Sequence, residues 1–165
     1  MALASRVYLD TNILISVFEG KDEMSVALRD LLVVENPLDK PLFVTSALTF
    51  AELLVIPIRE KDEELVLSYR AWSMGTRHLE VVPVAGDVLF NAAACRARYA
   101  SLKLPDAIHI ATASGMKCSR MLTYDKRLVA YTPSFNPGLI GRSLPVIRIE
   151  RPDMTVIDEL KQLLS

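Results

Sequence analysis

Short apolar segments typical of β-strands alternate along this chain with longer segments typical of helices. The strand-like segments lie at residues 7–9, 42–45, 79–82 and 121–123, with a further candidate at 144–149. The helical segments between them lie at residues 12–18, 24–34, 47–56, 62–72, 86–99 and 105–114. Strands separated by helices favour parallel pairing, so this order predicts an α/β fold with a central parallel sheet covered by helices on both faces.

The composition fits one folded domain over residues 1–165, since a domain typically contains about 150 residues. Apolar residues make up 51% of the chain and charged residues 24%, which excludes a disordered tail protein. No apolar segment approaches the roughly 20 residues of a membrane span. The first residues lack a basic segment followed by an apolar one, so we expect no secretory signal and a cytoplasmic location. Cys95 and Cys118 lack CxxC spacing and are expected to be free thiols.

The net charge of −1 is unevenly distributed. Residues 1–95 contain 8 Lys or Arg and 14 Asp or Glu, whereas residues 96–151 contain 10 Lys or Arg and 3 Asp or Glu. Such asymmetry can mark a surface that binds a polyanion. The alternative is that the fold mixes both halves and that the charges alternate over the surface.

Four acidic residues occupy positions that differ from those of ordinary surface acids: Asp10, Glu52, Asp106 and Asp125. Asp10 and Asp125 each follow an apolar strand, where ligands bind in open α/β sheets. Each has a structural alternative, because an aspartate there can also cap the next helix. Glu52 lies inside an apolar helical segment, either as a functional carboxylate or on the polar edge of a packed helix. Asp106 follows Pro105 at a helix start, where it can simply complement the helix dipole.

All four carboxylates can converge on one edge of the predicted sheet. Like charges at 4 Å repel by about 4 kcal/mol at an effective dielectric constant of 20. Such a pocket therefore needs cations, or the pKa values of its carboxyl groups must rise. Carboxylate oxygens suit Mg²⁺ or Mn²⁺, and the sequence has no Cys/His cluster with zinc spacing.

Four motifs in this order resemble those of the PIN domain family, most closely its VapC-type toxin ribonucleases. The motifs are Val-Tyr-Leu-Asp10-Thr-Asn12, Thr-Phe-Ala-Glu52-Leu-Leu, Leu-Pro-Asp106-Ala-Ile-His109-Ile-Ala and Leu-Thr123-Tyr-Asp125-Lys-Arg-Leu. The resemblance covers about residues 5–150 and implies a three-layer α/β/α fold. It also implies a metal-dependent endoribonuclease in which these four acids bind Mg²⁺ or Mn²⁺.

The resemblance also implies roles for neighbouring residues and for partners. Asn12 matches an asparagine that orients the first aspartate, and Thr123 matches a hydroxyl beside the last one. His109 lies three residues after Asp106 and is either a positioning group for that carboxylate or a structural residue. Glu52 is either a metal ligand or the base that takes a proton from water. RNA, a small antitoxin protein and a second copy of the chain in a homodimer are the expected partners.

Basic residues surround the last two acids and are candidates for holding the RNA backbone: Arg96, Arg98, Lys103, Arg120, Lys126 and Arg127. The alternative is a solvated helix face. Two other functions stay open, namely a PIN-domain nuclease of RNA processing without a toxin role and a PIN-like module that binds RNA or protein without cleaving it. Four mutually repelling carboxylates argue against the binding module.

The end of the chain has the pattern of a short amphipathic helix. Residues 154–164 place apolar side chains on one stripe, composed of Val156, Ile157, Leu160, Leu163 and Leu164. A helix of this length is marginal alone in water, so we expect the stripe to pack on another apolar surface. Residues 152–165 therefore form either part of the chain's own core or a C-terminal extension that contacts a dimer mate or an antitoxin.

Overall fold

A five-stranded parallel sheet is the centre of the computed structural model, which describes residues 6–33, 40–131 and 146–164. The strands are β1 (Arg6–Leu9), β2 (Phe43–Ser46), β3 (Leu79–Val82), β4 (Cys118–Leu122) and β5 (Arg148–Glu150). They pair in the order β3-β2-β1-β4-β5, and every pair is parallel. The predicted parallel sheet is confirmed.

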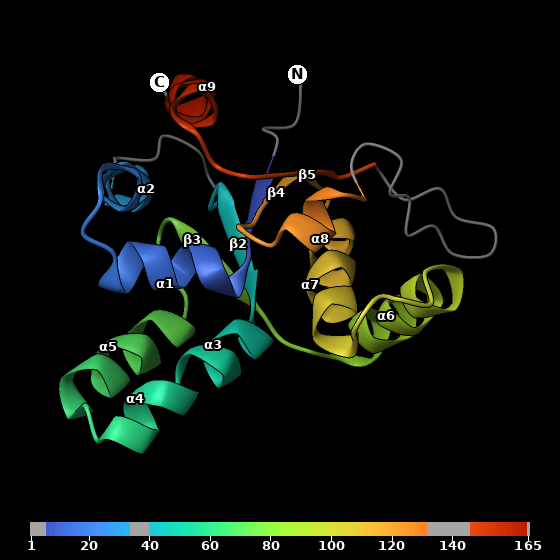
Figure 1. Cartoon of the computed structure of the whole chain (residues 1–165), viewed down its shortest axis with the longest axis horizontal. Helices are drawn as coiled ribbons and strands as arrows, with labels where there is room; N and C mark the ends of the chain where they lie inside the picture. The colour runs from blue at the N-terminus through green and yellow to red at the C-terminus, as the bar shows by residue number, and fades with distance from the viewer. Residues whose placement is uncertain (1–5, 34–39, 132–145, 165) are drawn as a thin grey trace.

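Helices cover both faces of this sheet and complete the three predicted layers (Figure 1). One side carries α1 (Thr11–Glu19), α2 (Glu23–Val33), α3 (Ala47–Leu53), α4 (Val55–Glu60), α5 (Glu63–Ser73) and α9 (Met154–Leu164). The other side carries α6 (Gly86–Arg98) and α7 (Leu104–Gly115), and the short α8 (Lys126–Val129) follows β4. The α/β/α fold class is therefore confirmed.

The central strands β1 and β2 are buried, and their side chains alternate between two cores. Val7 and Leu9 pack with α1, α2 and α9, whereas Tyr8 between them packs with α6 and α7. In β2, Phe43 joins the first core and Val44 the second. Side chains of successive strand residues point to opposite faces, so each strand supplies both cores at once.

The helix predicted over residues 47–56 ends earlier than expected, and this correction has a local cause. Helix α3 stops at Leu53 and a new helix, α4, contains Pro57 in its first turn. A proline ring clashes with the carbonyl group four residues earlier, which here belongs to Leu53. Pro57 therefore breaks the helix one turn before its own position instead of ending it there.

The other predicted elements are present with shifted ends. The strand predicted at 121–123 begins at Cys118 and ends at Leu122, so Thr123 lies just beyond it. The last strand begins at Arg148, and residues 144–145 of the predicted segment lie outside the described residues. Ser46 caps α3, since its hydroxyl accepts a hydrogen bond from the Leu48 amide.

The C-terminal helix α9 is part of the chain's own core. Val156, Ile157, Leu160 and Leu164 are buried and pack with α2, so the intramolecular alternative is confirmed. Leu163 is 42% exposed, so its predicted place on the buried stripe is wrong. Asp153 begins the helix by accepting a hydrogen bond from the Val156 amide.

Cys95 and Cys118 are free and buried, and burial raises the pKa of each thiol, to about 11 and about 12 respectively. Both side chains belong to the core between the sheet and α6–α7. Across the described ranges, every helix is too short or too polar to span a lipid bilayer.

Candidate active site

The strand order places a topological switch point between β1 and β4. The chain proceeds from β1 to β2 on one side of the sheet, and from β4 to β5 on the other. Ligands of open α/β sheets bind beyond the carboxyl ends of the strands at such a point. Asp10 directly follows β1, and Asp125 lies shortly after β4, so the two aspartates flank the switch point.

Asp10 is 6% exposed and is held by hydrogen bonds on both carboxylate oxygens. Its Oδ1 accepts from the Thr11 amide at 2.8 Å, which caps α1. Its Oδ2 accepts from Thr123 Oγ1 at 2.6 Å and from Asn12 Nδ2 at 3.1 Å. Asn12 thus lies beside Asp10 as expected, whereas the Thr123 hydroxyl, which was expected beside Asp125, also binds Asp10.

Asn12 and Thr123 also connect the two strand ends. Asn12 Nδ2 donates to Thr123 Oγ1 at 3.1 Å, and Asn12 Oδ1 accepts from the Tyr124 amide at 2.9 Å. Thr123 Oγ1 also accepts from the Asp125 amide at 3.0 Å. The Thr123 hydroxyl thus joins the loop after β4 to Asp10 after β1.

We expect Thr123→Val to destabilise the protein by about 1–3 kcal/mol, because the buried partners of its hydroxyl lose their hydrogen bonds. Urea denaturation of the purified variant measures this change. Thr112→Val is the matched control, since the equally buried Thr112 hydroxyl donates only to the Ile108 carbonyl within α7. A Thr123→Val cost no larger than that of Thr112→Val would contradict the role given to this hydroxyl.

Glu52 extends from α3 toward α7 and is partly exposed, with a side-chain exposure of 34%. Its Oε2 accepts hydrogen bonds from the Thr11 hydroxyl and from His109 Nε2, the latter at 3.0 Å. Partial burial raises the pKa of Glu52, but the hydrogen bonds from His109 and Thr11 outweigh it and hold the pKa below its ordinary value. Glu52 is therefore ionised at neutral pH.

His109 lies on the face of α7 that packs against the sheet and is 1% exposed. Its Nε2 faces Glu52 and lies 3.7 Å from Asp10 Oδ1, while its Nδ1 lies 2.7 Å from the Tyr8 hydroxyl. The sequence spacing suggested Asp106 as the partner of His109. The structure pairs it with Glu52 of α3 instead, with His109 Nε2 at 3.0 Å from Glu52 Oε2.

Asp106 lies in the first turn of α7 and is partly buried. Within the part of the chain that the structure describes, its carboxylate receives no hydrogen bond. Burial raises the pKa of Asp106, nearby Arg127 lowers it, and the charges of Asp125 and Asp10 raise it further. The negative charges of Asp10 and Asp125 therefore both act on the Asp106 carboxyl group.

Asp125 is tied to Arg127, whose Nη2 donates to Asp125 Oδ2 at 2.6 Å. This hydrogen bond is the main reason that the pKa of Asp125 falls below its ordinary value. Asp125 Oδ1 also accepts from the Arg127 amide at 2.8 Å and so caps α8. Asp10 and Asp125 therefore both cap the helices that follow them, and both also lie at the ends of strands.

The chemistry of these four side chains fits a hard divalent cation, since all their donor atoms are carboxylate oxygens. In residues 6–33, 40–131 and 146–164, however, no three Asp, Glu, His or Cys side chains are gathered closely enough to form a metal site. Asp10, Glu52 and Asp125 are turned toward their hydrogen-bond donors, whereas Asp106 has none. The residues therefore fit Mg²⁺ or Mn²⁺ in type, and binding would require their side chains to turn toward a common ion.

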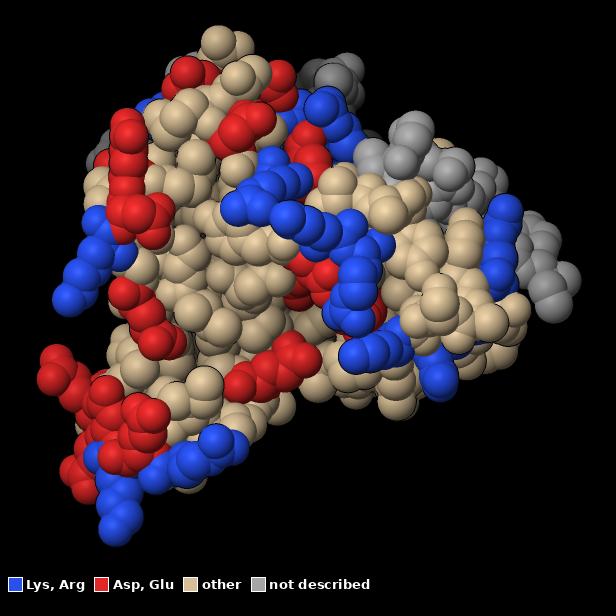
Figure 2. Space-filling view, viewed as in Figure 1, with Lys and Arg blue, Asp and Glu red and all other residues tan. Residues whose placement is uncertain are grey.

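The predicted basic residues divide into two groups. Lys103, Lys126 and Arg127 are exposed on the α7 and α8 side of the site. Figure 2 shows Lys and Arg side chains crossing the face above α8, with acidic side chains recessed beside them. Arg96 and Arg98 are exposed near the end of α6, where Arg96 donates to the Leu102 carbonyl.

Arg120 has a different environment from the other five basic residues. It lies in the middle of β4 and forms ion pairs with Glu150 of β5 and Glu159 of α9. The charge of Arg120 is thus balanced by two carboxylates inside the fold, so Arg120 is not part of the exposed basic surface.

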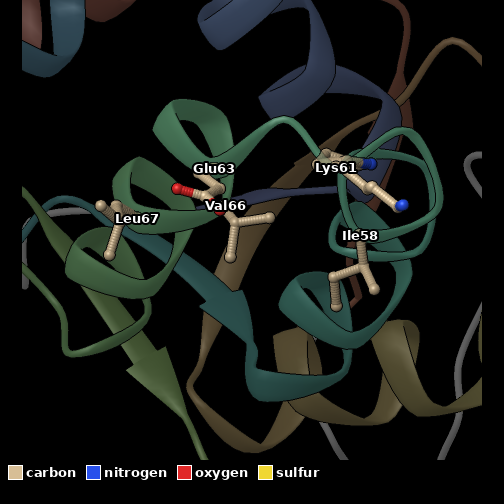
Figure 3. A pocket seen from close by; sticks show the side chains of 6 residues that line it. Ile58, Lys61, Glu63, Val66 and Leu67 are labelled. Atoms are coloured by element: carbon tan, nitrogen blue, oxygen red, sulfur yellow. The ribbon is translucent and has the colours of Figure 1, made fainter.

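A shallow pocket lies apart from these carboxylates, between α4 and α5 (Figure 3). Its lining residues are Pro57, Ile58, Lys61, Glu63, Val66 and Leu67. None of the four predicted acidic residues contributes to it. The concave feature at α4–α5 is therefore separate from the candidate active site.

The PIN domain family model matches residues 7–132. This match covers most of the chain, including Asp10, Glu52, Asp106 and Asp125, so the protein belongs to the PIN domain family. The family is one of nucleases, which supports an enzyme that hydrolyses nucleic acid. A comparison with curated proteins gave no match.

Solved structures with similar folds include several toxins. One chain in a toxin–antitoxin complex from Klebsiella pneumoniae is 27% identical, with a TM-score of 0.56 over 82% of this chain and 100% of that chain. A chain of VapBC2 from Rickettsia felis, bound to a promoter DNA fragment, is 16% identical, with a TM-score of 0.61 over 89% and 98% of the two chains. VapC20 from Mycobacterium tuberculosis, titled a Sarcin-Ricin loop cleaving toxin, is also 16% identical, with a TM-score of 0.60 over 76% and 95%.

Sequence reasoning missed two residues that contact the candidate site, Tyr8 and Thr11. Tyr8 lies within an apolar strand, and nothing in its local pattern distinguishes it from a core aromatic residue. Thr11 directly follows Asp10, and its hydroxyl binds Glu52, which is 41 residues away in sequence. The position of Thr11 directly after Asp10 is the sequence feature that could have indicated its place in the site.

Proposed function

We propose that the protein is a Mg²⁺- or Mn²⁺-dependent endoribonuclease and the toxin of a toxin–antitoxin pair. The observation that carries this proposal is the placement of Asp10 and Asp125 after the two strands of the switch point, with Glu52 bound to Thr11 beside Asp10. Carboxylates that share one sheet edge repel one another, and a phosphodiester brings further negative charge, so a bound cation would favour both the site and its substrate. The family match and the toxin–antitoxin complexes among similar structures support the same function.

Asp10 and Asp106 are the proposed direct ligands, with Glu52 and Asp125 completing the carboxylate set. A divalent ion held there would lower the pKa of a water molecule and offset negative charge on the phosphate under attack. Asn12 and Thr123 orient Asp10, while Thr11 and His109 orient Glu52. Glu52 is ionised at neutral pH and only partly buried, so it can also accept a proton from water.

The substrate is proposed to be single-stranded RNA whose backbone lies along the exposed basic residues. Lys103, Lys126 and Arg127 lie within three residues of Asp106 or Asp125 in the sequence. The charge of Arg127 acts on both of these aspartates. Arg96 and Arg98 can extend this path over α6. Contacts to phosphates position a nucleic acid without reading its sequence, so this surface favours RNA binding in general.

Purified protein is expected to cleave single-stranded RNA with Mg²⁺ or Mn²⁺ and to lose this activity in excess EDTA. Readdition of the metal should restore cleavage, which separates chelation from unfolding. Full activity in EDTA would contradict the metal dependence. RNA binding without cleavage in every metal tested would instead favour the non-cleaving module.

Expression of the wild-type chain in a bacterial host is expected to arrest growth, and Asp10→Asn is expected to relieve the arrest. Growth is followed after induction, with protein levels compared by immunoblot. Asp30→Asn is the control, because Asp30 is an exposed residue of α2 that belongs to none of the motifs. Normal growth with active enzyme at high expression would favour a processing nuclease without a toxin role.

The remaining partners follow from the proposed toxin role. An antitoxin protein is the expected inhibitor, in line with the toxin–antitoxin complexes among similar structures. The two free cysteines, Cys95 and Cys118, fit the reducing cytoplasm. Assembly as a homodimer stays a prediction.

A further inference from the structure

Tyr8 is a fully buried tyrosine whose hydroxyl points at the candidate site from the core. It belongs to β1, two residues before Asp10, and is 0% exposed. Its hydroxyl oxygen lies 2.7 Å from His109 Nδ1, and the two rings make an edge contact with centroids 5.9 Å apart. A polar group at this depth needs a partner, and the imidazole supplies one.

The two threonine hydroxyls nearest to Tyr8, those of Thr45 and Thr49, direct their hydrogens elsewhere and do not donate to the Tyr8 hydroxyl. Thr45 Oγ1 donates to the Leu9 carbonyl at 2.8 Å, so in its 2.8 Å contact with Thr49 Oγ1 it accepts. The hydrogens of both threonine hydroxyls are then in use. The hydrogen of the Tyr8 phenol is then directed at His109 Nδ1, which lies 2.7 Å from the hydroxyl oxygen.

An imidazole that accepts at Nδ1 carries its hydrogen on Nε2. This second nitrogen lies 3.0 Å from Glu52 Oε2 and 3.7 Å from Asp10 Oδ1. The opposite tautomer would direct a nitrogen lone pair at two carboxylate oxygens, which is unfavourable. The position of the Tyr8 proton therefore determines which nitrogen of His109 faces the acids.

We propose that Tyr8 is a positioning residue that acts through His109 to orient the Glu52 carboxylate. Thr11 and His109 both bind the same oxygen of Glu52, Oε2. The other oxygen, Oε1, is thus the one available to a cation or to water. The functional consequence rests on the proposed nuclease activity, whereas the tautomer of His109 does not depend on it.

Nitrogen-15 NMR of the metal-free wild-type protein at neutral pH tests the tautomer directly. The chain has only two histidines, so a His78→Gln variant assigns the two imidazole patterns. His109 is expected to be protonated at Nε2 and unprotonated at Nδ1. A hydrogen on Nδ1 of His109 would overturn the proposal. This test uses the wild-type protein and needs no substitution of Tyr8.

Tyr8→Phe tests the consequence for Glu52, with Tyr69→Phe as the matched control. Tyr69 is equally buried, and its hydroxyl also donates to a side chain, Glu19, but it lies in α5 outside the candidate site. Removing a hydrogen bond behind a metal ligand typically costs about 10- to 100-fold in metal affinity or activity. Tyr8→Phe is expected to lower kcat by about 10-fold, with little change in the KM for RNA.

Calorimetric titration with Mn²⁺ gives a second measurement that does not depend on cleavage. The Kd for Mn²⁺ should rise by about 10-fold in Tyr8→Phe and stay unchanged in Tyr69→Phe. Equal kcat and equal Mn²⁺ affinity in the two folded variants would overturn the role of Tyr8. A wild-type protein that cleaves no RNA would contradict the proposed function but not the role of Tyr8. That role would still be tested by the tautomer of His109 and by the Mn²⁺ affinities.

Discussion

Asp106→Asn is expected to lower metal-dependent RNA cleavage by at least about 100-fold while the metal-free protein stays as stable as the wild type or becomes more stable. Replacing a carboxylate ligand removes a charge and a donor oxygen, which costs more than the roughly 10- to 100-fold typical of supporting residues. Asp106 receives no hydrogen bond within the described ranges, so the substitution removes no hydrogen bond from the fold. The cleavage rate and the melting temperature without metal measure the two effects.

The direction of the stability change follows from the raised pKa of Asp106. A carboxyl group whose pKa is higher in the folded than in the unfolded state binds more protons when folded. Its contribution to stability therefore falls as the pH rises from the unfolded-state pKa through the folded-state pKa, and at neutral pH it is unfavourable. The neutral asparagine side chain of the variant lacks this penalty.

Two comparisons make the Asp106→Asn experiment decisive. Mg²⁺ should raise the melting temperature of the wild type more than that of the variant, because a ligand that binds the folded state stabilises it. Asp30→Asn should leave both cleavage and the response to Mg²⁺ unchanged. Undiminished cleavage by purified Asp106→Asn protein would refute the assignment of this residue.

Deletion of residues 151–165 is expected to unfold the protein or make it insoluble. Helix α9 buries Val156, Ile157, Leu160 and Leu164 against α2 and its surroundings. Burial of each such side chain stabilises the fold by roughly 1.5–3 kcal/mol, or about 6–12 kcal/mol for the four. This range is similar to the whole stability of a typical domain, which is about 5–15 kcal/mol.

A pair of single substitutions tests the same packing in protein that still folds. Leu160 is 0% exposed, so Leu160→Ala should cost about 2–5 kcal/mol of stability in urea denaturation. Leu163 is 42% exposed on the same helix, so Leu163→Ala should change stability by less than about 0.5 kcal/mol. A truncated chain that keeps the wild-type melting temperature would show that α9 does not stabilise the fold.

The sequence alone predicted much of the fold because its elements are set by local patterns. Strand and helix order and the apolar stripe of α9 depend on residues within a few positions of one another. Helix ends were less predictable. The break before Pro57 depends on a clash with the carbonyl of Leu53 rather than on the proline position itself.

The candidate site was predictable in its residue types but not in its contacts. Asp10 and Asp125 follow strands, and parallel strands end at a common edge, so their neighbourhood could be anticipated from order alone. The pairing of His109 with Glu52 could not, because the spacing of three residues to Asp106 pointed to a different partner. Likewise, the sequence showed Arg120 only as one basic residue among several, while the fold pairs it with Glu150 and Glu159.

By itself, the sequence determined the order of strands and helices, the four acidic motifs and the apolar pattern of the C-terminal helix. Only the tertiary structure decided that the Tyr8 hydroxyl meets His109, 101 residues later, and that His109 faces Glu52, 57 residues before it. Periodicity specifies which face of an element is apolar. Contacts between distant elements depend on strand register and on how α3 and α7 pack against the sheet, and a single sequence does not contain those distances in its local pattern.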